Sequence, residues 1–336
     1  MTQTVSVDNS ARIVAFGEIL WDMLPTGPKL GGAPVNFLYH ARVIGANVQA
    51  LTRIGDDQLG RDILARLDEL QLPTEFVQIS KTAPTGVVNV TLDAIGNPTY
   101  KIVENVAWDE IEVDDKIAEE TLKFLSGSPA SAFYFGSLAL RTNGNREALE
   151  RLILQLPSGV LRVCDLNIRP PFYSKEIVDF ALRHSDVFKL NDVEAVELDA
   201  LFADRTPPLL AALADADKGL GGAITTRKAE ADAVLAQWAE NWQNKFGLKT
   251  IILTCGAHGA YLFNEGRISY APSIPVTVAD AVGAGDSFAA VCVVGILTGE
   301  SDDVIVKAAS TRAAFVCSQS GGTPKIPAEN ANPFRS

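Results

Sequence analysis

Hydrophobic and polar positions follow two repeating patterns along this chain. Short apolar runs of strand length recur, and segments with apolar residues at helical spacing lie between many of them. The apolar runs predict strands at residues 12–18, 48–55, 132–136, 161–167, 186–191, 250–256, 259–264 and 267–272. The helical spacing predicts helices at 35–45, 58–70, 115–125, 144–155, 174–184, 285–298 and 302–318, and a helical region at 192–246. Strands that alternate with helices indicate an α/β fold in three layers: a doubly wound, mostly parallel sheet with helices on both faces.

Residues 84–104 depart from this alternation. The sequence PTGVVNVTLDAIGNPTYKIVE alternates around IGNP without a following helix, which predicts two antiparallel strands. With short strands near 20–32, these would form a small separate sheet, although the Gly- and Pro-rich stretch 23–34 indicates a loop. The domain prediction is therefore a main α/β domain and a small β domain. The main domain would comprise 1–20, 33–83 and 106–336, and the small one 21–32 and 84–105.

Composition excludes several classes of partner. The chain has 336 residues, 47% of them hydrophobic, and a net charge of −12. This acidity argues against nucleic acid or an anionic membrane as a general partner. The four cysteines are isolated, and the N-terminus lacks a basic start followed by an apolar run. We therefore expect a cytoplasmic protein; no role is predicted for 203–246.

Common catalytic motifs are missing from the sequence. It contains no GxxxxGK[ST] loop, no GxGxxG fingerprint, no GxSxG elbow and no HExxH motif. The three histidines are widely spaced and do not suggest a metal cluster. Hydride transfer, serine hydrolysis and zinc chemistry are therefore disfavoured.

The stretch DAVGAGDSFAA at 280–290 offers a different chemistry. GAGD precedes an apolar helix, so backbone N–H groups at the helix N-terminus can bind a phosphate that small side chains let approach. A carboxylate beside a phosphate needs a task, and Asp286 would take the proton from a hydroxyl that attacks phosphorus. The alternative is structural: Gly283 and Gly285 serve a turn, and Asp286 caps the helix.

Five motifs in one order resemble the ribokinase-like carbohydrate kinase family. DAVGAGD resembles the signature D-T-x-G-A-G-D, with Ala281 in the threonine position, which shapes the loop. The other motifs are GGAPVN (31–36), RIGDDQLG (53–60), KLNDVE (189–194) and LTCGAHGAYLF (253–263). Together they span roughly residues 12–325. The resemblance implies ATP-dependent phosphorylation of a sugar hydroxyl.

The resemblance assigns roles around the phosphates. Asp286 would be the general base, with the N–H groups of Gly283, Ala284 and Gly285 as the anion hole. Asn191 and Glu194 would hold Mg²⁺, chiefly through water, although from the residues alone Glu194 reads as a surface carboxylate. Asn191 would also border the nucleotide. The same role is implied for Thr254, Gly256 and Gly259, for which the alternative is a structural one, as a strand end and a turn.

A second set of residues would bind the sugar. Asp22 follows the first strand, and ligands of such sheets lie beyond the carboxyl ends of strands. Gly31, Gly32 and Asn36 resemble the family's sugar contacts, since glycines let a ring lie against the backbone and an amide can donate and accept. The alternatives are a loop carboxylate for Asp22 and an ordinary first-turn helix residue for Asn36.

Two segments favour fructose as the sugar. In DLNIRPPFYS (165–174), Arg169 lies in a loop stiffened by prolines, where it could bind sugar oxygens or the phosphoryl group. This pattern resembles fructokinases and ketodeoxygluconate kinases, and NVAWDEI (105–111) resembles a segment of fructokinase-like members. We therefore predict phosphorylation of fructose to fructose 6-phosphate. The alternatives are 2-keto-3-deoxygluconate, ribose or a nucleoside as acceptor, or a sensor of sugar or nucleotide without catalysis.

The resemblance also gives the small sheet a use. In this family such a sheet is a lid over the sugar, and its outer face is often a dimer contact. The apolar residues of 87–92 fit either role, so a homodimer through the lid is expected. The family often places a monovalent cation such as K⁺ near the signature's first aspartate, here Asp280, and the loop 320–327. Asp280 could equally cap a strand end.

Overall fold

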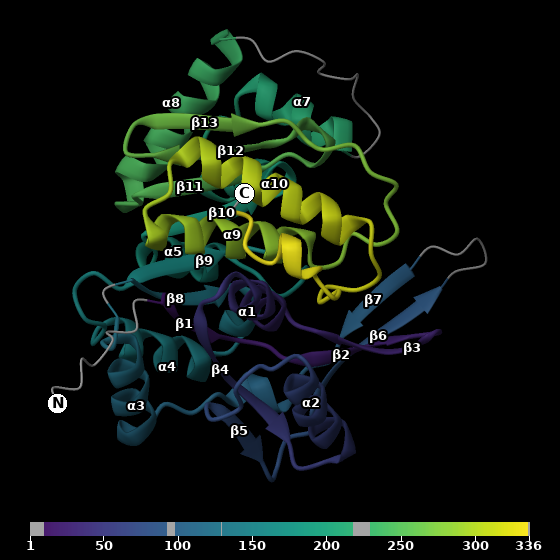
Figure 1. Ribbon diagram of the computed structural model, residues 1–336. Helices are drawn as coiled ribbons and strands as arrows, with labels where there is room; N and C mark the ends of the chain where they lie inside the picture. The colour runs from purple at the N-terminus through teal and green to yellow at the C-terminus, as the bar shows by residue number, and fades with distance from the viewer. Residues whose placement is uncertain (1–9, 93–97, 129, 218–228, 335–336) are drawn as a thin grey trace, which may run out of the picture.

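The chain folds around one large sheet. A computed structural model describes residues 10–92, 98–128, 130–217 and 229–334, and the sheet crosses its centre (Figure 1). In spatial order its strands are β13 (Arg267–Ala271), β12 (Ala260–Asn264), β11 (Thr250–Thr254), β10 (Val187–Asn191), β9 (Leu161–Asp165), β8 (Ser131–Gly136), β1 (Arg12–Phe16), β4 (Asn47–Gly55) and β5 (Val77–Ser80). All neighbours from β5 to β11 pair in parallel, and β12 and β13 extend the sheet by antiparallel pairing.

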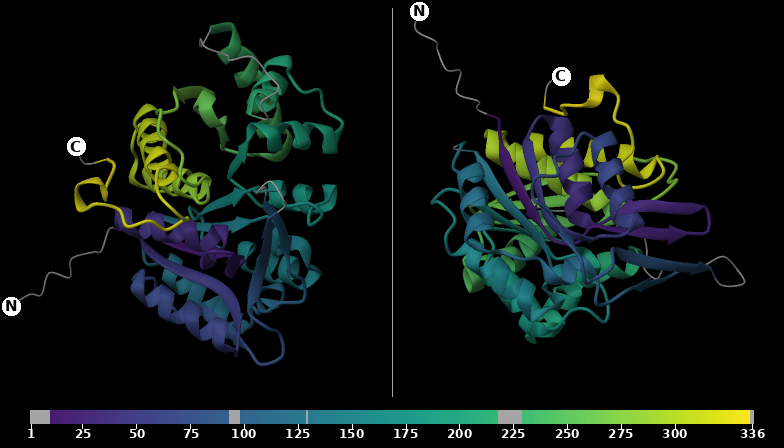
Figure 2. Two further views of the ribbon diagram at one scale, coloured as in Figure 1. Left: turned by 90° about the vertical axis from the view of Figure 1, so that its right-hand side faces the viewer. Right: turned by 90° about the horizontal axis from the view of Figure 1, so that it is seen from below.

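Helices cover both faces of this sheet. One face carries α1 (Ala33–Ile44), α2 (Gln58–Glu69), α9 (Ala284–Thr298) and α10 (Asp302–Cys317). The other carries α3 (Asp115–Leu125), α4 (Asn143–Ile153), α5 (Lys175–Arg183), α6 (Asp192–Phe202), α7 (Pro208–Asp217) and α8 (Ala229–Phe246). The predicted three-layer α/β architecture is confirmed, and the two further views show the same layering (Figure 2).

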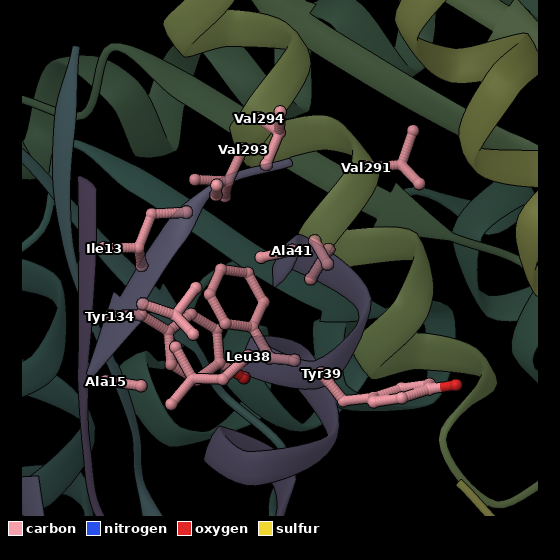
Figure 3. Packing of buried hydrophobic residues seen from close by; sticks show 14 of the residues in the cluster. Ile13, Ala15, Leu38, Tyr39, Ala41, Tyr134, Val291, Val293 and Val294 are labelled. Atoms are coloured by element: carbon pink, nitrogen blue, oxygen red, sulfur yellow. The ribbon is translucent and has the colours of Figure 1, made fainter. Parts of the chain in front are cut away.

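Side chains alternate between the two faces of the sheet along each strand, and each face is apolar and covered by a layer of helices. In β1, Ile13 and Ala15 belong to the core under α1 and α9, whereas Val14 and Phe16 belong to the core under α3 to α8. Successive side chains of a strand point to opposite faces, so a strand buried on both sides is apolar throughout. Figure 3 shows the first core, where Tyr134 from β8 lies among side chains of α1.

A second, smaller sheet extends from one side of the molecule (Figure 1). Its strands, in spatial order, are β3 (Gly27–Gly31), β2 (Leu20–Leu24), β6 (Gly86–Leu92) and β7 (Pro98–Ile102). The hairpin of β6 and β7 is antiparallel as predicted; its turn at IGNP lies mostly outside the described residues. The side chains of Trp21 and Leu30 fix this sheet to the body of the protein by entering the core under α1.

The short strands predicted near 20–32 are confirmed, whereas the structure corrects the loop prediction for 23–34 and adds one strand. The stretch 23–34, expected as loop because of its glycines and prolines, supplies part of β2 and all of β3, which pair residue by residue. The strand β5 was not predicted, because VQIS is short and its apolar residues do not form a run; its pairing with β4 makes it a strand. No helix among the described residues is both long enough and apolar enough to span a membrane.

Candidate active site

The first turn of α9 is the centre of the site. Gly283 is the N-cap with φ 78°, and α9 then runs apolar and buried from Ser287 to Gly295. The amide of Ala284 donates to the carbonyl of Ala281 at 3.3 Å, so this predicted donor of the anion hole is partly engaged. The first N–H groups of a helix have no carbonyl one turn earlier, and the helix dipole makes this end positive. The amides of the GAGD turn can therefore bind an anion.

Asp286 does not cap this helix, so the structural alternative is wrong for it. Its Oδ2 accepts a hydrogen bond of 2.8 Å from Nδ2 of Asn36, which lies on α1, 250 positions earlier in the sequence. The motifs GGAPVN and GAGD thus meet in space. Burial, and then the charge of Asp165, raise the pKa of Asp286 to about 6; Lys189, the Asn36 bond and Arg169 oppose this shift. A carboxylate with this pKa is ionised at pH 7 and is basic enough to accept a proton.

The turn also packs against the C-terminal loop. A Cβ atom on Gly283 would lie 2.4 Å from Cα of Gly322, so the two backbones touch and only glycine fits there. The carbonyl of Gly322 lies 3.0 Å from Nε2 of the fully buried His40, which is one helical turn beyond Asn36. The hydroxyl of Tyr39 donates to the carbonyl of Pro324. Helix α1 therefore fixes the C-terminal loop beside the N-terminus of α9.

Asp22 lies in a strand of the small sheet, so the alternative of a loop carboxylate is wrong. It stands opposite Lys29 in the β2–β3 register, and its Oδ2 lies against the backbone of Gly31. Burial raises the pKa of Asp22 to about 6, with Arg169 and Lys29 lowering it and Asp280 raising it. Gly32 follows as the N-cap of α1. The predicted sugar residues are therefore neighbours, at the junction of the two sheets.

Arg169 lies in the loop that follows β9. Its side chain is exposed and donates to the carbonyl of Ile168 at 3.0 Å. Four carboxyl groups have pKa values that are raised mainly by burial and lowered by the charge of this guanidinium. They are Glu18, Asp22, Asp165 and Asp286. The charge of Arg169 thus acts on Asp22 and Asp286, two of the predicted site residues.

Glu194 is buried, so its interpretation as a surface carboxylate is wrong. Its two carboxylate oxygens accept the N–H groups of Ile168 and Asn191, each at 2.9 Å. The side-chain oxygen of Asn191 accepts the N–H of Glu194 in return, which completes a capping box at the start of α6. Glu194 thereby attaches the loop that carries Arg169 to the N-terminus of α6.

The other predicted residues lie at strand ends around this centre. Thr254 ends β11, Gly256 begins a 3₁₀ turn and Gly259 precedes β12. A Cβ atom on Gly259 would lie 2.2 Å from the carbonyl oxygen of Ala271, so packing alone already requires glycine here. These positions are the strand end and turn that the structural alternative describes, and a nucleotide contact is not needed to explain Gly259.

Asp280 joins the site to the C-terminal loop. Its two oxygens accept the N–H groups of Val282, at 3.0 Å, and Gly321, at 2.9 Å. The ammonium of Lys29 lies 3.6 Å from Oδ2 of Asp280 and donates to the hydroxyl of Ser320 at 2.7 Å. A lysine of the small sheet therefore contacts both segments that the sequence suggested for a monovalent cation.

Several residues of the site region were not predicted from the sequence, among them three with buried charged side chains. Glu18, two residues after the end of β1, is buried, and burial raises its pKa to about 7. Its Oε1 accepts the N–H of Ala33. Its position at the carboxyl end of a central strand was the available signal. Lys189 within KLNDVE lies buried beside Asp165. No sequence pattern pointed to Arg141, the third residue.

Arg141 connects the two segments that resemble fructokinases. Its guanidinium lies between the rings of Trp108, at 4.0 Å, and Phe172, at 4.6 Å. It also makes two hydrogen bonds of 2.7 Å to the carboxylate of Asp109. Cation–π contacts and a two-pronged carboxylate bond are among the stronger interactions of a buried arginine. Arg141 thus fixes the loop of Arg169 relative to the segment 105–111.

The chain is similar to known proteins in sequence and in fold. A family model described as pfkB family carbohydrate kinase matches residues 26–329. The probable fructokinase-2 of Arabidopsis thaliana is 23% identical over 96% of this chain and 94% of its own length. The structure of 2-dehydro-3-deoxygluconokinase from Thermotoga maritima superposes with a TM-score of 0.75 at 20% identity, covering 96% of this chain and 98% of that one. A fructokinase mutant from Vibrio cholerae O395, with fructose, ADP and potassium bound, gives 0.70 at 20% identity over 94% and 95%.

Proposed function

Because this chain belongs to the pfkB family of carbohydrate kinases, we propose that it transfers the γ-phosphoryl group of ATP to a sugar hydroxyl, with fructose as the preferred acceptor. The family membership predicted from the motifs is confirmed. One observation carries the proposal: Asp286, bonded to Asn36, stands on the helical turn whose amides can bind a phosphate. A base and an anion site on one turn are what phosphoryl transfer to a hydroxyl requires.

The chemical step follows from this arrangement. Asp286 takes the proton of the hydroxyl, the sugar oxygen attacks the γ-phosphorus, and the bond to the β–γ bridging oxygen breaks to release ADP. The N–H groups at the start of α9 stabilise the charge on the phosphoryl oxygens. Asn36 orients the Asp286 carboxylate. The charge of Arg169 lowers the pKa values of Asp22 and Asp286, and its guanidinium would bind the sugar or the transferring group.

Mg²⁺ would neutralise charge that develops between the β and γ phosphates. The side-chain oxygens of Asn191 and Glu194 already accept backbone N–H groups, so these residues suit an indirect contact. Among the described residues, no group of three or more His, Cys, Asp or Glu is arranged to hold a metal ion. Mg²⁺ usually keeps several waters and binds through phosphates. We therefore propose that Asn191 and Glu194 meet it through water.

The monovalent cation expected at Asp280 fits this structure less well. Both carboxylate oxygens of Asp280 accept backbone N–H groups, and the ammonium of Lys29 already lies 3.6 Å away. A potassium ion here would compete with that ammonium for the same carboxylate. The fructokinase from Vibrio cholerae O395 was solved with potassium bound, but our mechanism uses no step that depends on K⁺.

The small sheet would act as the lid. Asp22, Lys29 and Val88 share the face of this sheet that is turned toward the site, because directly opposed residues of neighbouring strands lie on one face. The same face carries an apolar cluster around Leu20 and Val90. An apolar lid with one carboxylate can bind sugar hydroxyls and exclude water, which competes as a nucleophile.

A substrate panel tests the proposal directly. ADP release would be measured with ATP and Mg²⁺ against fructose, ribose, 2-keto-3-deoxygluconate, adenosine and no sugar. We expect turnover with fructose to exceed that with every other acceptor by at least about tenfold, about 1.4 kcal/mol of transition-state discrimination. Turnover with another acceptor would keep the kinase and replace the substrate. Binding of ATP without turnover on any acceptor would favour a sensor of sugar or nucleotide.

Replacement of Asp22 tests the sugar site. Asp22→Ala removes a charged hydrogen-bond acceptor, so we expect the apparent KM for the sugar to rise at least about tenfold while the KM for ATP changes little. Steady-state kinetics with each substrate varied in turn measure both values. Asp68→Ala, at an exposed carboxylate of α2, is the control and should leave both constants unchanged. An effect confined to ATP would remove Asp22 from the sugar site.

The pKa of Asp286 predicts how activity depends on pH. The base works only when ionised, and its pKa is raised to about 6. We therefore expect kcat/KM for the sugar to fall about tenfold per pH unit as the pH drops below about 6, and to be level above it. Asp22 has a similar pKa and could contribute to this fall in activity. Asp22→Ala removes that contribution, so the fall that remains in this variant would belong to Asp286. A profile that is flat from pH 5 to pH 7 would contradict the role of Asp286.

A homodimer through the lid completes the proposal. Tyr100 on β7 is 58% exposed, a large aromatic surface at the edge strand of the small sheet. If this sheet joins two copies, light scattering after size exclusion should give twice the chain mass. Tyr100→Glu should then shift the protein toward the monomer, whereas a wild-type monomer would refute the dimer.

A further inference from the structure

A buried ion pair lies directly beneath the proposed anion hole. Lys189 of β10 stands opposite Asp165 of β9 in the parallel register, and Nζ lies 3.0 Å from Oδ1. Their side chains are 7% and 0% exposed. Val187 and Val163, two positions earlier on the same strands, belong to the core under α9. Because side chains alternate between faces, Lys189 and Asp165 also point toward α9.

The ammonium of Lys189 contacts the first turn of α9. A Cβ atom on Gly285 would lie 3.0 Å from Nζ and 3.9 Å from Cε of Lys189, so the glycine leaves the space that the lysine end fills. Gly285 immediately precedes Asp286. Lys189 is therefore in contact with the same helical turn that carries the base and the amides of the anion hole.

This placement puts a buried cation beside the positive end of a helix. A helix N-terminus repels a cation, and the loss of water around a buried ammonium costs free energy. The carboxylate of Asp165, whose Oδ1 lies 3.0 Å from Nζ, offsets part of this cost. An ammonium has three N–H donors, and the hydrogen bond to Asp165 uses one of them. A phosphoryl group bound at the turn would give the ammonium a second anionic partner.

We propose that Lys189 is a further catalytic residue, whose ammonium contacts the phosphoryl group in transfer while Asp165 holds it against Gly285. The proposal rests on the proposed function and extends it. Lys189 keeps its proton throughout, and no bond to it forms or breaks; it stabilises charge on the phosphoryl oxygens as the group passes from ADP to the sugar oxygen. Asp165 touches no substrate and is a positioning residue.

The first experiment compares nucleotide binding and turnover in Lys189→Met. We expect kcat to fall at least about a hundredfold, the size seen when one such donor is lost. By calorimetry with Mg²⁺, we expect the Kd of adenylyl imidodiphosphate, an ATP analogue that keeps its γ-phosphoryl group, to rise about tenfold more than that of ADP. A structural role would weaken both nucleotides alike. Equal changes in the two Kd values, or kcat within about threefold of wild type, would overturn the proposal.

Two further variants separate this role from folding. Lys249→Met removes a lysine that lies 3.1 Å from the Asp186 carboxylate, just before β11 and at the opposite end of the strands from the site. It should leave kcat and both Kd values unchanged. Gly285→Ala keeps every charge but displaces the ammonium, so we expect kcat to fall about tenfold with the melting temperature nearly unchanged. An unchanged kcat in Gly285→Ala would count against the contact even if Lys189→Met fails to fold.

The binding measurement also distinguishes the two proposals. If the wild-type protein turns over none of the sugars in the panel, the proposed function fails. The difference between the two Kd values still decides whether Lys189 meets the γ-phosphoryl group, since that measurement needs no turnover.

Discussion

Asp286→Asn should lower kcat at least about a hundredfold while sugar and ATP still bind with nearly unchanged affinity. Asparagine has the shape of the aspartate and can still accept the hydrogen bond from Asn36, but it cannot take a proton from the attacking hydroxyl. Loss of the base affects the transition state and not the ground state, so kcat falls and KM does not rise. Steady-state kinetics together with calorimetric titration of each substrate measure the two parts separately.

The control for this variant is Asp303→Asn. Asp303 is an exposed carboxylate in the first turn of α10, the helix that follows α9. It shares with Asp286 its position near a helix N-terminus but lies outside the proposed site, so kcat should be unchanged. Turnover in Asp286→Asn equal to that of wild type would remove Asp286 from the mechanism, whatever the control shows.

Asp199→Ala should give the largest loss of stability among the variants considered. Asp199 on α6 is fully buried, and its carboxylate accepts the indole N–H groups of Trp238 and Trp242 at 3.0 Å. Its removal leaves two buried donors without this acceptor, at a cost of about 1–3 kcal/mol each. We expect the free energy of unfolding to fall by about 2–6 kcal/mol. Urea denaturation followed by tryptophan fluorescence would measure this, since two of the four tryptophans report on the site directly.

Two further variants serve as comparisons for Asp199→Ala. Asp199→Asn keeps one side-chain oxygen as an acceptor and should lose less stability than Asp199→Ala. Glu197→Ala changes an exposed carboxylate on the same helix and should stay within about 0.5 kcal/mol of wild type. If Asp199→Ala unfolds at the same urea concentration as Glu197→Ala, the carboxylate does not hold α6 and α8 together. The result would also give a structural role to part of 203–246, for which the sequence suggested none.

The sequence motifs predicted individual residues of the site but not how they are arranged in space. Asp286 and Asn36 were both predicted, each from a short local motif. Asp286 belongs to a glycine turn before an apolar helix, and Asn36 belongs to a stretch of small residues before a second helix. Their hydrogen bond joins positions 250 residues apart. The two residues come together only because α1 and α9 pack on the same face of the sheet, and no local sequence pattern predicts that packing.

The sequence by itself determined the alternation of strands and helices, because burial on both faces demands continuous apolar strands and one-sided burial demands a helical period. The helix at 115–125 is found with the predicted bounds for this reason. Strand β3 lacks any apolar run and exists because β2 offers it a partner. Glu18, Arg141 and Lys189 gain their surroundings from strand register and loop packing, so only the tertiary structure could reveal them. The chemistry of a buried charge depends on what lies beside it in space, and that is decided by the fold.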